Sequence, residues 1–203
     1  MIEKVGILGG TFNPIHNGHI ALGLEAAKEH GLDKVLMIPT GISYCKNNVL
    51  DGKNRLNMVR MACKPHPILH VSDLEVNRCG NTYTIDTIRA VREQYPLAQL
   101  FFIIGEDTLY SIEHWKNSDT LLSMVTLLVA IRGCHKTEQY SNQIVYLQEK
   151  YHATIALLSM MPVVISSTEI RNRIVVGESV TEFLNDEVDA YIQEHGIYKE
   201  SLE

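Results

Sequence analysis

Short continuous runs of apolar residues alternate along the chain with longer segments whose apolar residues recur at helical spacing. The continuous runs predict buried strands at Lys4–Gly9, Lys34–Pro39, Ile68–Val71, Leu100–Gly105, Thr126–Arg132 and Thr154–Met160. The periodic segments predict helices at His16–His30, Asn54–Lys64, Thr84–Tyr95, Glu138–Tyr151, Thr168–Val176 and Asn185–His195. Gly31 and Gly196 are expected to cap two of these helices, and a broken helical region containing Trp115 is expected after the fourth strand. This alternation predicts an α/β fold, in which helices cover both faces of a doubly wound parallel sheet.

The predicted sheet restricts where a ligand can bind. Parallel α/β sheets bind their ligands in the crevice at the carboxyl ends of the strands, close to the point where the strand order reverses. The loops to search are therefore the ones that follow Gly9, Pro39, Gly105, Arg132 and Met160.

The charge of the chain argues against two kinds of partner. Its 203 residues include 18 Lys and Arg against 24 Asp and Glu, a formal net charge of −6. An acidic chain is unsuited to sequence-independent binding of nucleic acid or of a membrane surface, so we expect neither as a partner. Residues 178–203 hold eight acids and one base, which leaves residues 1–177 close to neutral. The four cysteines show no metal-site spacing, which favours a reduced, cytoplasmic protein.

The loop after the first predicted strand carries the sequence GGTFNPIHNGH, from Gly9 to His19. Two glycines at the end of a strand let the phosphates of a ligand approach the backbone closely. The helix that follows offers its N–H groups and the positive end of its dipole to anions. Because His16 and His19 are three residues apart in the first turn, both imidazoles can donate to one phosphate chain. The alternative is a tight turn before a helix that carries two surface histidines.

Two better-known phosphate-binding motifs are absent from the sequence. There is no GxGxxG, and Pro39-Thr40 stands where an acid would close the second strand of a nicotinamide-dinucleotide site. There is no GxxxxGK[ST] either, which excludes a P-loop. The first loop therefore predicts a phosphate site of another kind.

The loop after the last predicted strand carries ISSTEIR, from Ile165 to Arg171. Ser166 and Glu169 have the spacing of a capping box, so a helix begins here whatever the function. The same segment places hydroxyl groups and backbone N–H groups at the helix N-terminus, with Arg171 in its first turns. Two anion-binding loops at the same edge of one sheet indicate a polyphosphate held between them.

GGTFNPIHNGH together with ISSTEIR resembles the nucleotidyltransferase superfamily that is marked by (H/T)xGH and SSTxxR-like motifs. The middle of the chain narrows the resemblance to the bacterial nicotinate-nucleotide adenylyltransferases, through Tyr83–Thr87 (YTIDT), Phe101–Asp107 (FFIIGED) and Trp115. The resemblance runs from Lys4 to about Tyr198.

The resemblance implies a Rossmann-like sheet of the nucleotidyltransferase type, in one domain over residues 1–203 with a helical C-terminal portion from about residue 166 to 203. It implies adenylyl transfer from ATP to nicotinate mononucleotide, which yields deamido-NAD and pyrophosphate in NAD biosynthesis. Mg²⁺ is expected to enter with ATP, and no separate metal site is expected. The residues implied to bind ATP are Gly9, Gly10, Thr11, Phe12, His16, His19, Gly105, Asp107, Ser167, Thr168 and Arg171. Those implied to bind the acceptor are Thr40, Lys46, Thr84 and Trp115, and those implied to act in catalysis are His16, His19, Lys46 and Arg171.

The chain departs from the family pattern at several positions. Asn13 stands where the family commonly has Asp, and Ile15 stands where it often has a second Pro. The segment Ser43–Lys46 (SYCK) replaces the usual Pro-Pro-His-Lys but retains the lysine. The segment 132–134 (RGC) lacks the expected Pro after Arg.

Adenylyl transfer needs no protein nucleophile, which agrees with the absence of an obvious acid–base pair in these motifs. A phosphate monoester has its second pKa near 6, so at pH 7 it is mostly dianionic and can attack the α-phosphorus of ATP itself. The enzyme has to hold two anions in line and stabilise charge as pyrophosphate leaves. Imidazoles, a lysine, an arginine, helix N-termini and Mg²⁺ are suited to that task.

Three alternatives stay open. The acceptor could be nicotinamide mononucleotide, because the sequence does not fix the donors that would distinguish the acid from the amide. It could be phosphopantetheine, although those enzymes are shorter and lack the YTIDT and Trp115 neighbourhood. A catalytically silent nucleotide-binding regulator is disfavoured because His19 and Arg171 are both present. Whether the chain forms a homo-oligomer is left open.

Overall fold

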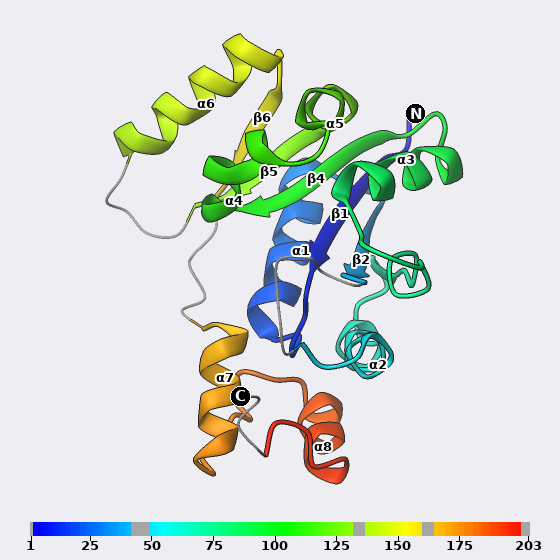
Figure 1. Ribbon diagram of the computed structural model, residues 1–203, viewed down its shortest axis with the longest axis vertical. Coiled ribbons are helices and arrows are strands. Elements are labelled where there is room, and N and C mark those ends of the chain that lie inside the picture. Colours follow the sequence, from blue (N-terminus) through cyan, green and yellow to red (C-terminus); the bar gives the residue numbers. More distant parts are fainter. Residues whose placement is uncertain (1, 42–48, 132–136, 160–164, 200–203) are drawn as a thin grey trace.

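The computed structural model describes residues 2–41, 49–131, 137–159 and 165–199. Its centre is a six-stranded sheet with the order β3-β2-β1-β4-β5-β6, in which every neighbouring pair is parallel (Figure 1). The strands are β1 Lys4–Gly10, β2 Lys34–Pro39, β3 Leu69–Val71, β4 Gln99–Gly105, β5 Thr126–Ala130 and β6 Thr154–Leu158. The prediction of a doubly wound, Rossmann-like parallel sheet is confirmed. The strand order reverses between β1 and β4, which places the expected ligand crevice at their carboxyl ends.

The helices follow the strands in the predicted order. They are α1 Asn17–His30, α2 Gly52–Cys63, α3 Thr84–Gln94, α6 Thr137–Tyr151, α7 Ser167–Val175 and α8 Asp186–Glu194. The broken helical region after β4 consists of α4 Glu106–Ser111, the short 3-10 helix η1 Ile112–His114 and α5 Ser118–Met124. Across the described residues, none of these helices combines the length and the apolar character needed to cross a bilayer.

Helices cover both faces of the sheet and enclose two hydrophobic clusters. On one face, strand residues such as Leu8 and Met37 pack with α1, α2, α7 and α8. On the other face, residues such as Ile7 and Phe102 pack with α3, α4, α5 and α6. Successive strand residues point to opposite faces, so Ile7 and Leu8 belong to different clusters. This explains why the strand segments are apolar without interruption.

Local capping decides where the helices begin and end. α2 begins at Gly52, before the predicted start at Asn54, because the Asp51 carboxylate accepts from two backbone N–H groups of the first turn at 2.9 and 3.1 Å. Gly31 caps α1 in the left-handed region at φ 60°, as predicted. Gly196 closes α8 as predicted: it has φ 62°, its N–H donates to the Gln193 carbonyl at 3.3 Å, and the Ile197 N–H donates to the Ile192 carbonyl at 3.0 Å.

The acidic C-terminal part of the chain, which begins at residue 178, includes α8 but not α7, and Figure 1 shows both helices beyond the carboxyl end of β1. Three of its acids, Asp186, Glu187 and Asp189, lie in the first turn of α8, where negative charge favours the helix dipole. Glu187 also pairs with Lys64 of α2 at 2.7 Å. The concentration of acids in this part of the sequence therefore has a structural role.

Candidate active site

The loop after β1 is packed tightly against the first turn of α1. Gly10 ends β1, and a Cβ atom at this position would lie 2.7 Å from the Phe12 ring, so a larger residue would force a shift. Phe12 is buried and has φ 49°, in the left-handed region. Its ring meets the His19 ring edge-on, with centroids 5.0 Å apart. Gly10 is thus needed for the close packing of Phe12 at the strand end, whereas a Cβ atom at Gly9 would meet nothing within 4 Å.

His16 and His19 are in direct contact at the N-terminus of α1. Their ring centroids are 3.7 Å apart, with 30° between the ring planes. The His16 backbone N–H donates to His19 Nδ1 at 3.3 Å, so a neutral His19 ring carries its proton on Nε2. That Nε2–H is the group that can donate to a phosphate oxygen.

The N-terminus of α7 is joined to the first loop by side-chain hydrogen bonds. Ser166 caps α7, because its Oγ accepts the backbone N–H three residues further on at 3.1 Å. Ser167 Oγ donates to the Pro14 carbonyl at 2.9 Å. Arg171 Nη1 donates to the Asn13 carbonyl at 2.8 Å. The structure thus brings together the two loops that the sequence predicts to bind phosphate.

The segment after α8 also reaches this loop. Tyr198 is 6% exposed, and its hydroxyl donates to Asn13 Oδ1, itself buried, at 2.6 Å. Burial raises the pKa of the Tyr198 hydroxyl, which therefore stays protonated as a donor. The amide that replaces the family's usual Asp at position 13 is thus held by a residue from the other end of the chain.

Tyr198→Phe removes this donor and leaves a buried amide oxygen unsatisfied. We expect the free energy of unfolding to fall by about 1–3 kcal/mol. Urea denaturation measures the change, with Tyr110→Phe, at an exposed tyrosine of α4, as a control that loses nothing. Equal stability of the Tyr198→Phe variant and the unmodified chain would contradict the buried hydrogen bond.

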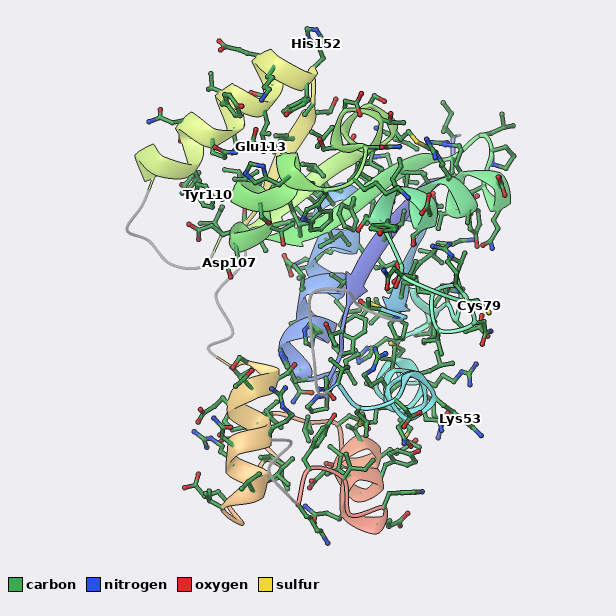
Figure 2. All side chains as sticks on the ribbon, in the orientation of Figure 1. Lys53, Cys79, Asp107, Tyr110, Glu113 and His152 are labelled. Carbon is green, nitrogen blue, oxygen red and sulfur yellow. The ribbon has the colours of Figure 1, made fainter. Side chains whose placement is uncertain are left out.

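A cavity of about 370 Å³ lies at the carboxyl ends of β1 and β4. Most of the residues predicted to bind ATP line it, namely Gly9, Gly10, Thr11, Phe12, His16, His19, Gly105, Asp107 and Ser167. Asp107 is exposed, and Figure 2 shows it pointing down from the start of α4. Thr168 and Arg171 are not among the lining residues but lie beside Ser167 on α7, where Arg171 Nη2 donates to Thr168 Oγ1 at 3.2 Å.

A second cavity, of about 260 Å³, adjoins the first at the ends of β1 and β2. Thr40, Thr84 and Trp115, all predicted to bind the acceptor, line it. The Trp115 ring packs against Phe102, with centroids 6.3 Å apart at an angle of 62°. The residues that line both cavities are Gly9, Gly10, Thr11, Phe102 and Trp115. The two cavities therefore share a wall at the end of β1.

Sequence reasoning missed three polar residues in the second cavity: Glu75, Thr82 and Thr87. Glu75 is 8% exposed and accepts from the Thr87 hydroxyl at 2.7 Å and from the Gly41 N–H at 3.3 Å. Burial raises the pKa of this carboxyl, and the two hydrogen bonds and nearby arginines only partly oppose the effect. No local pattern marks Glu75 and Thr82, because the segment 72–83 consists mainly of turns and loops. Thr87 is the last residue of the YTIDT motif on α3, but the motif alone gives it no role.

Some predictions concern residues outside the described ranges. These are Lys46 with the rest of Ser43–Lys46, the segment 132–134, and Met160 at the predicted end of the last strand. The role of Lys46 stays a prediction from sequence. Within the described ranges, no group of three or more His, Cys, Asp or Glu side chains is arranged to hold a metal ion.

The parallel sheet, the HxGH motif at the start of α1 and the N-terminus of α7 beside it together define a nucleotidyltransferase. Residues 7–173 match the cytidylyltransferase-like family. A protein of Lachnoclostridium phytofermentans, described as a probable nicotinate-nucleotide adenylyltransferase, is 35% identical over 199 residues, covering 97% of this chain and 100% of that protein. One of Clostridium botulinum (strain Alaska E43 / Type E3) with the same description is 36% identical over 201 residues, covering 98% and 100%. The chain belongs to the nicotinate-nucleotide adenylyltransferase family.

A solved structure shares the fold over the whole chain. The nicotinic acid mononucleotide adenylyltransferase of Plasmodium falciparum, in its complex with NaAD, superposes with a TM-score of 0.82 at 18% identity. The match covers 99% of this chain and 100% of the Plasmodium chain. The six-stranded architecture is therefore retained at low sequence identity.

Proposed function

We propose that the chain transfers the adenylyl group of ATP to nicotinate mononucleotide, yielding deamido-NAD and pyrophosphate in NAD biosynthesis. The observation that carries the proposal is the pair of adjoining cavities with a common wall at Gly9, Gly10 and Thr11. The N-termini of α1 and α7 border the first cavity and suit a phosphate chain. Hydroxyl groups and an indole ring line the second and suit a mononucleotide. Transfer between two bound substrates requires such adjacent sites.

The first cavity is assigned to ATP. His16 and His19 are placed to donate to its phosphates, and Ser167, Thr168 and Arg171 approach from α7. Arg171 is already hydrogen-bonded to the first loop through Nη1, which holds its other N–H groups in place before substrate binds. The Ser167 hydroxyl donates its proton to the Pro14 carbonyl and so fixes α7 against the same loop. Donors that need no reorganisation are the ones that stabilise developing charge most effectively.

The reaction in this site is an in-line displacement. An oxygen of the dianionic mononucleotide phosphate attacks the α-phosphorus of ATP and forms a new P–O bond. The bond from the α-phosphorus to the bridging oxygen breaks, and pyrophosphate leaves with its electron pair. No protein group changes covalently, so the contribution of the chain is alignment and charge stabilisation.

Mg²⁺ enters this proposal as part of the ATP-Mg²⁺ substrate. The ion prefers oxygen ligands, keeps several waters, and is commonly held by substrate phosphates with only one or two carboxylates. Asp107, in the lining of the first cavity, is the carboxylate we assign to the hydrated ion.

The second cavity is assigned to the mononucleotide. Trp115 offers an aromatic face on which the pyridine ring can stack. Thr40 and Thr84 offer hydroxyl groups, and Thr84 is also the first residue of α3. A helix N-terminus favours an anion, so this arrangement favours the carboxylate of nicotinate over the neutral amide of nicotinamide.

The proposal treats residues 1–203 as one domain that acts in the cytoplasm. α7 and α8 share a hydrophobic cluster with β1 and α1, so the C-terminal part completes a common core. Cys63 and Cys79 are free thiols, as expected in a reducing compartment.

Pyrophosphate release from ATP-Mg²⁺ with three acceptors in parallel tests the proposed function. We expect kcat/KM with nicotinate mononucleotide to exceed that with nicotinamide mononucleotide by about tenfold or more, since unpaired polar groups penalise the wrong acceptor. We expect no release with phosphopantetheine. A higher kcat/KM with nicotinamide mononucleotide would show that the amide is the acceptor. If the chain binds ATP but releases no pyrophosphate with any acceptor, it is a nucleotide-binding regulator and not an enzyme.

A further inference from the structure

We propose that Arg55 is a positioning residue for adenylyl transfer, which fixes the backbone where the two cavities meet. The inference rests on the proposed function, because it concerns how the two substrates are aligned. Arg55 lies in the first turn of α2, outside both loops that the sequence predicts to bind phosphate.

The Arg55 guanidinium donates to three backbone carbonyls from separate segments of the chain. Nη1 donates to the Thr11 carbonyl at 2.7 Å, Nη2 to the Thr40 carbonyl at 2.6 Å, and Nε to the Leu50 carbonyl at 2.7 Å. Thr11 and Thr40 directly follow the paired strands β1 and β2. One side chain therefore ties together the ends of two neighbouring strands and the segment that leads into α2.

Arg55 occupies a position that is unfavourable for a cation. The residue is 2% exposed, and burial lowers the pKa of its guanidinium because the charged form loses contact with water. The first turn of α2 adds the positive end of the helix dipole. The negative charges of Asp51 and Glu75 oppose this lowering of the pKa and stabilise the charged guanidinium in part. The three carbonyls accept from three of the five N–H groups of the guanidinium. A lysine could not reach three divergent acceptors at once.

The carbonyls that Arg55 holds belong to residues in the walls of the cavities. Thr11 lines both cavities and Thr40 lines the second. A trans peptide is planar, with its N–H directed opposite to its C=O. Holding the Thr11 carbonyl therefore directs the Phe12 N–H away from Arg55, and holding the Thr40 carbonyl does the same for the Gly41 N–H. Arg55 thus sets the direction of the Phe12 N–H, whose residue lines the first cavity, and of the Gly41 N–H, which holds Glu75 in the wall of the second cavity at 3.3 Å.

Alignment, more than affinity, depends on this contact. Each cavity keeps its own lining side chains when the guanidinium is removed, so each substrate still binds. The relative position of the two reacting groups changes, however, because the loops after β1 and β2 then keep the backbone hydrogen bond from the Thr40 N–H to the Gly10 carbonyl, at 2.8 Å, but lose the guanidinium that ties them. A displacement of about 1 Å in a reacting pair can cost about a hundredfold in rate.

The test compares Arg55→Met and Arg55→Lys with the matched control Arg92→Met. From α3, Arg92 donates to the carbonyls of Ala98 and Met124, which precede β4 and β5 at the opposite end of the sheet. Rates of pyrophosphate release are measured per folded molecule, well below each unfolding midpoint. We expect Arg55→Met to lower kcat about thirtyfold while each KM stays within about threefold. We expect Arg55→Lys to lower kcat about fivefold, and Arg92→Met to leave kcat unchanged despite a lower unfolding midpoint.

Several outcomes would overturn the positioning role of Arg55. Unchanged kcat in Arg55→Met, or an equal loss in Arg92→Met, leaves Arg55 with a purely structural role. A raised KM for ATP at unchanged kcat assigns it to binding instead. If Arg55→Met does not fold, Arg55→Lys decides: wild-type kcat overturns the role, and a loss of about fivefold at an unchanged unfolding midpoint supports it. The unmodified chain is assayed alongside the variants. If it releases no pyrophosphate with any acceptor, the proposed function fails together with this inference. If it is active and only the variants behave otherwise than expected, this inference alone fails.

Discussion

His19→Ala lowers kcat by about a hundredfold or more, the effect of removing one donor that acts in the transition state. The His19 ring accepts through Nδ1 from the His16 N–H at 3.3 Å, which leaves the Nε2 proton for a phosphate oxygen. Alanine removes that donor while the walls of both cavities stay in place. Steady-state pyrophosphate release, at saturating ATP-Mg²⁺ and nicotinate mononucleotide, measures the loss.

Two further variants separate the role of His19 as a donor from its role at the helix end. His19→Glu can accept from the His16 N–H as in a capping box, but it has no donor and brings a negative charge toward the phosphates. We expect it to be at least as stable as His19→Ala and no more active. His70→Ala, at an exposed position on β3, is expected to keep the full kcat. Turnover of His19→Ala within a factor of two of the unmodified chain would falsify the assigned role.

Arg171→Ala lowers kcat/KM for ATP by about a hundredfold, which corresponds to about 2.7 kcal/mol. Two contributions are lost together: a positive charge beside the phosphate chain, and the hydrogen bond that holds the Asn13 carbonyl at 2.8 Å. A loss of this size lies within the range for hydrogen bonds to charged groups. Initial rates of pyrophosphate release over a range of ATP concentrations measure it.

Arg173 provides the matched control for Arg171, because it lies on the same helix but pairs with Glu169 at 2.9 Å on the exposed side. We expect Arg173→Ala to keep kcat/KM within about a factor of two, since exposed ion pairs contribute little. Arg171→Lys keeps the charge but not the planar fork, and is expected to recover about tenfold relative to alanine. Equal losses in Arg171→Ala and Arg173→Ala would point to the stability of α7 and not to a role in binding phosphate.

The strands of this fold could be predicted closely because each is a continuous apolar run that ends at a recognisable signal. β2 spans Lys34–Pro39 as predicted, and β1 extends one residue beyond its predicted end, to Gly10. A strand covered by helices on both faces has to be apolar at successive positions, so the run itself defines the strand. Helix starts are less well defined by periodicity, because a cap such as Asp51 lies outside the apolar pattern.

In the site, residues that interact within one helix could be predicted, whereas residues that interact with distant segments could not. His16 with His19, and Ser167 with Arg171, could be recognised because each pair acts within one turn or two of a helix. Arg55 could not be recognised in the same way, because its acceptors are carbonyls of other segments. In sequence, an arginine in a first helical turn has the appearance of a solvated residue, and only the tertiary fold buries it.

Glu75 and Tyr198 show why the other residues of the site cannot be predicted from the sequence around them. Tyr198 is separated from its partner Asn13 by 185 positions. Glu75 lies in a segment of turns, where an acid is ordinarily exposed, yet it forms part of a cavity wall. Both positions depend on which elements the sheet order brings together, and a single sequence does not specify that order residue by residue.

The side chains of Ser167, Arg171 and Tyr198 join the loop from Gly9 to His19 to segments 153 to 185 positions further along the chain. Closing so long a loop costs conformational entropy, and the packed helices around the sheet have to offset that cost. The shape of the loop after β1 therefore depends on the packing of α7 and of the segment after α8. A substitution that loosens either of these segments also loosens the loop.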